Sequence, residues 1–132
     1  MKKVLIKGGY LAAGLLMAST CIANPIGHSE VISHCRYVSH ELMRLASWNN
    51  TAPCVGKVES SARYIEQAAN GVQKDQIPYA LGQLNFAVKT LNELSTQTEC
   101  IYFAIKTKPH LMQLERLSTE VESLDHYPQI RK

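Results

Sequence analysis

The stretch SEVISHCRYVSHELMRLAS, residues 29–47, decides the fold that we expect for this chain. Its apolar side chains follow one another at steps of four, three, four and three residues, at Val31, Cys35, Val38, Leu42 and Leu45. Because an α-helix has about 3.6 residues per turn, these steps place the side chains on one face. We therefore expect a helix over residues 29–47, capped by Ser29 and stopped by NNTAP at residues 49–53.

The same spacing recurs twice further along the chain. Residues 55–70 carry it at Val58, Ala62, Ile65 and Ala69, and residues 76–94 carry it at Ile77, Leu81, Leu84, Val88 and Leu91. We expect a second helix that ends at Asn70, with Gly71 in the left-handed conformation that closes many helices. We expect a third helix over residues 76–94, with Asp75 as its N-cap. No segment alternates apolar and polar residues convincingly enough to predict a strand.

The C-terminal third carries two apolar stripes that one straight helix would have to bury on opposite sides. Thr96-Gln97-Thr98-Glu99 has the spacing of a capping box, which predicts the start of a helix. That helix carries Ile101 and Ile105, whereas the later stripe consists of Leu114, Leu117, Val121 and Leu124. We predict a break at residues 107–109, with Pro109 in the first turn of a fifth helix. One kinked helix is the alternative. The predicted fold class is all-α, an up-down bundle of four or five helices that frays after about residue 125.

Residues 1–23 are typical of a secretory signal peptide. Lys2, Lys3 and Lys7 precede an uncharged, mostly apolar run over residues 8–18, which is shorter than the roughly 20 residues of a membrane span. Small residues before Asn24 predict cleavage after Ala23. Lipidation at Cys21 is the alternative. The expected mature chain is one helical domain over residues 24–132.

The signal accounts for all of the net charge. The chain has 14 Lys and Arg against 11 Asp and Glu; removing three lysines with residues 1–23 leaves 11 against 11. A mature chain of zero net charge lacks the global attraction to phosphate backbones that nucleic-acid-binding proteins use. We therefore expect no nucleic-acid partner.

Three cysteines remain after cleavage, and bundle geometry ranks their pairings. Cys54 follows the first predicted helix and Cys100 follows the third. Because these two helices run in the same direction, both loops lie at one end of the bundle, and we predict a Cys54–Cys100 disulfide. Cys35 lies on the core stripe, which indicates a buried free thiol. A bridge between two chains through Cys35 is the alternative.

The sequence contains no recognisable catalytic or cofactor-binding motif. G-x-S-x-G, H-E-x-x-H, P-loop, C-x-x-C and haem-attachment patterns do not occur. Glu120 and Glu122 are interpreted as solvated helix charges. We expect a protein that is not an enzyme and carries no metal or other cofactor.

Two surfaces are candidates for binding. The first consists of the basic and aromatic residues of the first helix: Arg36, Tyr37, His40, Arg44 and Trp48. Arg44 and Trp48, four residues apart, are spaced for a cation–π contact, and such a surface suits a partner or an anionic headgroup. The alternative is an ordinary solvated face.

The second surface is KTKPH at residues 106–110. If Pro109 opens a helix, free backbone N–H groups there would join Lys106, Thr107, Lys108 and His110 in binding an anion or phosphate. The alternative is a polar turn.

The signal MKKVLIKGGYLAAGLLMASTCIA, the small helical mature body and its few cysteines together resemble the small helical proteins that Legionella-like intracellular bacteria export by type II secretion. The resemblance covers general character and assigns no residue. It implies folding in the periplasm, release from the cell and a part in virulence. We expect an exported, non-enzymatic binding protein, monomeric or dimeric, that acts on a host or envelope partner. That partner is a protein or an anionic headgroup such as a phosphoinositide. A resident periplasmic structural, chaperone-like or inhibitor protein is the alternative.

Overall fold

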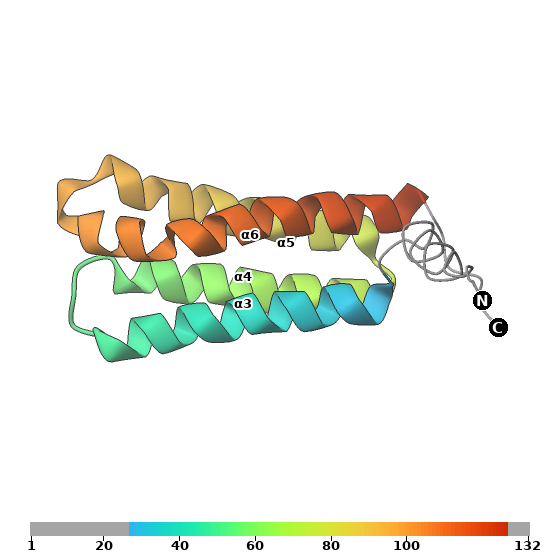
Figure 1. Cartoon of the computed structure of the whole chain (residues 1–132), viewed down its shortest axis with the longest axis horizontal. Coiled ribbons are helices and arrows are strands. Elements are labelled where there is room, and N and C mark those ends of the chain that lie inside the picture. The colour runs from blue at the N-terminus through green and yellow to red at the C-terminus, as the bar shows by residue number, and fades with distance from the viewer. Residues whose placement is uncertain (1–26, 127–132) are drawn as a thin grey trace, which may run out of the picture.

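The computed structural model describes residues 27–126, which form an up-down bundle of four long helices (Figure 1). The helices are α3 (His28–Trp48), α4 (Val55–Gln73), α5 (Ile77–Glu93) and α6 (Ile101–His126), with two short 3-10 turns, η1 (Leu94–Thr96) and η2 (Thr98–Cys100), before α6. The all-α bundle is confirmed. The expected signal, its cleavage after Ala23 and the frayed C-terminus lie outside the described residues. None of the described helices is both long and apolar enough to cross a bilayer.

The predicted stripes form the core, with a shift on α5 and one at the end of α3, where Ala46 is buried and Leu45 only partly buried. On α3, Val31, Cys35, Val38 and Leu42 are at most 2% exposed. On α5 the buried residues are Ile77, Ala80, Leu84, Ala87 and Leu91, whereas Leu81 and Val88 are only partly buried. The small alanines take the central positions because α4 and α6 pack on α5 from both sides, and Leu81 and Val88 fill the flanks.

Gly71 is a point of close approach, and the predicted helix end there is wrong. Helix α4 continues to Gln73, and Gly71 is buried within it. A Cβ atom on Gly71 would lie 2.9 Å from Tyr79 Cδ2 and 3.2 Å from Ala80 Cβ. The absence of a side chain is therefore what lets the start of α5 pack against the end of α4.

Asp75, predicted to cap α5, instead closes α4. Its φ of 60° lies in the left-handed region, which aspartate tolerates better than most residues. Asp75 N–H donates to Val72 O at 3.0 Å, and Gln76 N–H donates to Gly71 O at 2.7 Å. These two bonds are the pattern of a Schellman motif, four residues later than the sequence suggested. Gln76 occupies the N-cap position of α5.

The predicted break at residues 107–109 is wrong, because α6 runs through Pro109 as one helix. Proline lacks the N–H that would bond to the carbonyl of Ile105. Pro109 and Ile105 both lie on the exposed side of α6, where water can satisfy that carbonyl. The helix buries one stripe and leaves the other in solvent, with Ile101 and Ile105 54% and 65% exposed. Phe103 faces the core in their place.

The predicted capping box at residues 96–99 does not form. The hydroxyl of Thr96 donates backward to Glu93 O at 2.8 Å and closes η1. Gln97 is extended, and η2 follows it before α6 starts at Ile101. Because Gln97 is extended, no helix begins directly after Thr96, and the Thr96 hydroxyl meets no first-turn N–H group from which it could accept a capping bond.

The predicted Cys54–Cys100 disulfide is confirmed. The two Cα atoms lie 5.6 Å apart, and the bond joins the loop after α3 to the turn before α6. Both connections lie at the end of the bundle opposite the start of α3 and the end of α6 (Figure 1), hereafter the disulfide end. Cys35 is a free thiol with no exposed surface, as predicted.

Gly71→Ala should destabilise the fold, because the new methyl group meets α5 closely. We expect a loss of about 1–2 kcal/mol in the free energy of unfolding measured with urea. Gly82→Ala is the matched control on α5, where a Cβ meets nothing within 4 Å. It should stabilise by about 0.5–1 kcal/mol through helix propensity. A gain in stability for both variants would contradict the close packing of α4 on α5.

Removing the disulfide should cost much of the stability. The bond closes a loop with a sequence separation of 46, for which loop entropy gives about 4 kcal/mol. Cys54→Ala/Cys100→Ala should therefore lower the urea midpoint strongly, and dithiothreitol should lower it only in the unsubstituted chain. Peptide mapping without reduction provides the check, and a bond from Cys35 to either partner would refute the pairing.

Candidate functional site

The seam between α3 and α6 carries two hollows. Because the helices are antiparallel neighbours, the C-terminal half of α3 lies beside the N-terminal half of α6 at the disulfide end (Figure 1). There a hollow of about 100 Å³ is lined by Glu41, Arg44, Leu45, Trp48, Lys106 and His110. It joins two residues from each of the two surfaces that were predicted separately from the sequence. Arg44 and Trp48 come from α3, and Lys106 and His110 come from α6. We call it the disulfide-end hollow.

Arg44 organises the α3 side of this hollow. Its guanidinium lies 5.1 Å from the centroid of the Trp48 ring, so the predicted cation–π contact is formed. The guanidinium also donates to Glu41 Oε1 at 2.6 Å. This hydrogen bond lowers the pKa of Glu41 and raises the pKa of Arg44, so both groups stay charged. Trp48 remains 71% exposed and is the most exposed large apolar side chain among the described residues.

Arg36 and His40 do not join Arg44 and Trp48 in the basic and aromatic surface predicted on the first helix. Arg36 turns toward α4, where its Nε donates to Glu66 Oε2 at 3.1 Å and its Nη2 to Asn70 Oδ1 at 2.9 Å. Its charge is therefore used to hold α3 against α4. His40 is exposed but lines neither hollow of the seam. Four-residue spacing aligned these side chains on α3, but it did not reveal that α4 lies beside one of them.

The predicted phosphate cradle at residues 106–110 is wrong in its main assumption. Because α6 is continuous there, its backbone N–H groups bond within the helix and are not free for an anion. Thr107 is only 2% exposed, and its hydroxyl donates to Phe103 O at 2.6 Å. Lys108 is exposed but does not line the hollow. Only Lys106 and His110 remain as candidates, acting through their side chains.

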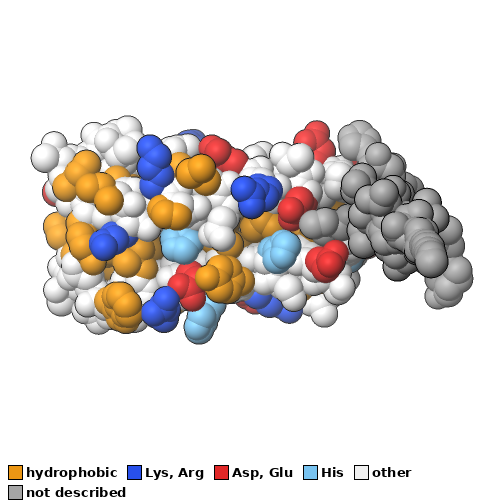
Figure 2. Space-filling view, in the orientation of Figure 1, with side chains coloured by type: hydrophobic (Ala, Val, Ile, Leu, Met, Phe, Trp, Pro, Cys, Tyr) orange, Lys and Arg blue, Asp and Glu red, His pale blue; other side chains and the backbone are white. Residues whose placement is uncertain are grey.

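Charge and apolar surface are segregated along α6. Residues 101–114 contain no acidic residue, whereas residues 115–125 contain four: Glu115, Glu120, Glu122 and Asp125. Figure 2 shows hydrophobic side chains gathered at the disulfide end with Lys and Arg among them, while most of the visible acidic side chains lie in the other half. The half of α6 at the disulfide end is thus the cationic and apolar half of that helix.

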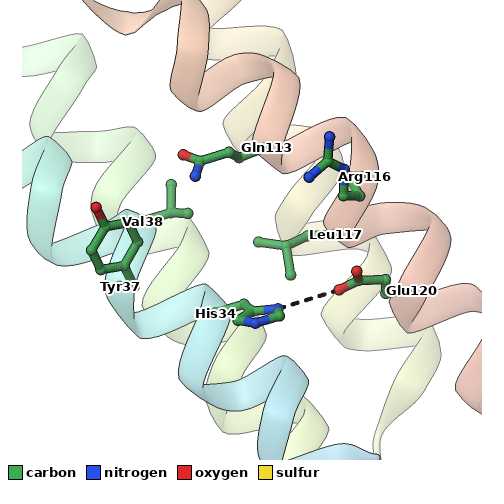
Figure 3. Close-up of a pocket in the computed structure, with 7 residues that line it drawn as sticks. All are labelled: His34, Tyr37, Val38, Gln113, Arg116, Leu117 and Glu120. Carbon is green, nitrogen blue, oxygen red and sulfur yellow. Dashed lines mark ion pairs between the residues drawn. The ribbon is translucent and has the colours of Figure 1, made fainter. Parts of the chain in front are cut away.

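A second hollow of about 180 Å³ lies further along the same seam (Figure 3). Its lining consists of His34, Tyr37 and Val38 from α3 and Gln113, Arg116, Leu117 and Glu120 from α6. The α6 side of this hollow was not predicted from the sequence, and Glu120 was interpreted as a solvated charge. The carboxylate is only 19% exposed and lies 3.5 Å from His34 Nδ1. Gln113, Leu117 and Glu120 recur at four and three residues, a helical spacing that could have indicated a shared face.

Neither the metal-ligating side chains nor the Cys35 thiol indicates a reactive site within the part of the chain that the structure describes. No group of three or more His, Cys, Asp or Glu side chains lies close enough together within residues 27–126 to hold a metal ion. Burial raises the pKa of the Cys35 thiol to about 12, and the negative charges of Glu120 and Glu66 add to this effect. A thiol that stays protonated and buried is a poor nucleophile.

Comparison with known proteins gives no relative, since no family model, curated protein or solved structure matches this chain. Function is therefore inferred from the chemistry of the seam.

Cys35 should resist alkylation while the protein is folded. With a pKa of about 12, about one thiol in ten thousand is ionised at pH 8. Iodoacetamide should therefore modify Cys35 only through unfolding, faster in urea and at high pH. The exposed thiol introduced by Ser33→Cys on the same helix is the control and should react at the rate of a free peptide thiol. Equal rates for both thiols would contradict the buried position of Cys35.

Proposed function

We propose that this chain is an exported, non-enzymatic binding protein whose disulfide end docks on anionic membrane headgroups, phosphoinositides among them. The observation that carries the proposal is the disulfide-end hollow. It brings Arg44, Lys106 and His110 together from two helices, next to the exposed ring of Trp48. The positive charges of Arg44 and Lys106 beside a shallow hollow suit the phosphate groups of a lipid surface.

The apolar side chains near the hollow support a membrane rather than a free anion. Trp48, Ile101 and Ile105 are each more than half exposed at the disulfide end. Tryptophan and aliphatic side chains gain free energy by entering the boundary between headgroups and acyl chains, while lysine and arginine stay at the level of the phosphates. Lys106 already lies 5.9 Å from the centroid of the Tyr102 ring, so cation and apolar surface are contiguous.

The charge segregation of α6 supports one orientation on the membrane. Each Lys or Arg near an anionic surface contributes about 1 kcal/mol, and acidic side chains are repelled. Residues 101–114 are free of acids, and the four acids of α6 lie beyond them. The disulfide end therefore faces the lipid and the other end faces water.

Export in this proposal rests on the signal-like residues 1–23 and on the resemblance to small proteins of type II secretion. A resident periplasmic structural, chaperone-like or inhibitor protein is the competing function. Cell fractionation separates the two, because the exported protein accumulates in culture supernatant and the resident one in the periplasm.

Membrane docking predicts a fluorescence change from Trp48, the sole tryptophan of the chain. Mature protein mixed with phosphatidylcholine vesicles containing phosphatidylserine or a phosphoinositide should show a blue shift, because the ring leaves water. Pure phosphatidylcholine should give none, and soluble inositol phosphate should compete without causing the shift. Unchanged emission with every anionic vesicle would refute membrane docking.

Charge reversal at the hollow provides the matched test. Arg44→Glu/Lys106→Glu should weaken cosedimentation with anionic vesicles at least about tenfold, since two attractive charges become repulsive. Arg63→Glu/Lys89→Glu makes the same change in net charge at exposed positions of α4 and α5 and should have little effect. Equal losses in the two variants would indicate that net charge, rather than this hollow, drives binding.

A further inference from the structure

The second hollow of the seam, at Tyr37 and Glu120, holds a carboxylate that lacks a hydrogen-bond donor. Glu120 Oε1 has essentially no exposed surface and accepts no hydrogen bond from any described residue. Its nearest ion-pair partner, His34 Nδ1, lies at 3.5 Å, beyond the usual length of such a bond. In Figure 3 the carboxylate of Glu120 and the ring of His34 face each other across the hollow.

A buried carboxylate oxygen of this kind favours a cationic donor. Leaving a buried charged acceptor unbonded is costly, and an ammonium group with three N–H donors removes that cost. The hollow opens to the surface between α3 and α6. Glu120 Oε1 is covered by the His34 ring, which is 55% exposed, so an ammonium group would reach this oxygen by displacing that ring. Glu120 therefore defines an amine-binding end.

The neighbouring end of the hollow offers donors to an anion. Arg116 lies one helical turn before Glu120 and forms no ion pair with any described residue, Glu120 included. Gln113 Oε1 lies 3.1 Å from His110 Nδ1, which leaves the amide NH₂ group of Gln113 to donate elsewhere. The four residues from Arg116 to Glu120 correspond to about 6 Å along the helix, a separation that suits a ligand with its two charges on neighbouring carbon atoms.

Between the charged groups the lining is apolar and the space is small. Val38 and Leu117 face each other there, and the volume is about 180 Å³, well below that of a typical drug-sized pocket. We propose that this hollow binds a free α-amino acid with a small aliphatic side chain. Its ammonium group contacts Glu120, its carboxylate contacts Arg116 and Gln113, and its side chain packs on Val38 and Leu117. This site is separate from the disulfide-end hollow and does not rest on membrane docking.

Three matched ligands test the proposal on the mature protein. L-Valine carries both charges, isobutylamine lacks the carboxylate, and isovalerate lacks the amine. NMR titration should give saturable shifts of the Leu117 methyl and His34 ring signals with L-valine, at a Kd of about 1 mM or tighter. The other two ligands should bind at least about tenfold more weakly, because each leaves one protein charge unpaired. Absence of saturation by L-valine at about 20 mM, or equal binding of one analogue, would overturn the proposal.

Two substitutions locate the site on the protein. Glu120→Gln and Arg116→Gln should each weaken L-valine binding at least about tenfold. Glu122→Gln on the exposed side of α6 and Arg63→Gln on α4 are the controls and should bind as the unsubstituted chain does. Arg116 is exposed and makes no ion pair within residues 27–126, so its variant should keep the circular dichroism and urea midpoint of the parent even if Glu120→Gln alters folding. Unchanged affinity in folded Arg116→Gln would overturn the assignment.

Discussion

Helix α6 can bury only one of its two apolar stripes, and the surface of the molecule follows from which stripe it buries. Phe103, Leu114 and Val121 face the core, so Ile101 and Ile105 remain in solvent. Because the helix continues through Pro109, Lys106 and His110 stay in register with the residues that follow and line the seam with α3. A break at residues 107–109 would have uncoupled the two halves of the helix. Both hollows of the seam thus depend on an uninterrupted α6.

The remainder of the fold serves as a rigid frame for that seam. Close packing at Gly71 sets the distance between α4 and α5, and the left-handed Asp75 turns the chain between them. The Cys54–Cys100 bond joins the loop that follows α3 to the turn that precedes α6. It therefore ties the two connections next to the disulfide-end hollow, where Arg44 and Lys106 must stay close together. Arg36 contributes from the other side by holding α3 to α4 through Glu66 and Asn70.

Much of the fold could be predicted from local periodicity, because burial repeats with the helical turn. The stripe from Val31 to Leu42 and the pairing of Cys54 with Cys100 needed only helix geometry and chain direction. The predictions that were wrong depended on which other helix, or whether solvent, lies next to a residue. Gly71 looked like a helix end, but α5 packs against it; Pro109 looked like a helix start, but its side of α6 faces water. The candidate site was predicted in part. Arg44 with Trp48 and Lys106 with His110 were identified on two separate surfaces, whereas the meeting of these surfaces, the loss of Arg36 to α4 and the burial of Glu120 are tertiary effects.

Amide hydrogen exchange at Lys108, His110 and Leu111 tests the continuity of α6 most directly. In one uninterrupted helix these three N–H groups bond to the carbonyls of Ala104, Lys106 and Thr107. If Pro109 instead opened a new helix, they would belong to its N-cap and first turn and have no partner within it. In one uninterrupted helix, the three amides should exchange as slowly as those of Leu114 and Leu117. Exchange at the rate of an unfolded chain at all three positions would contradict the continuity of α6, and with it the seam on which both proposed sites lie.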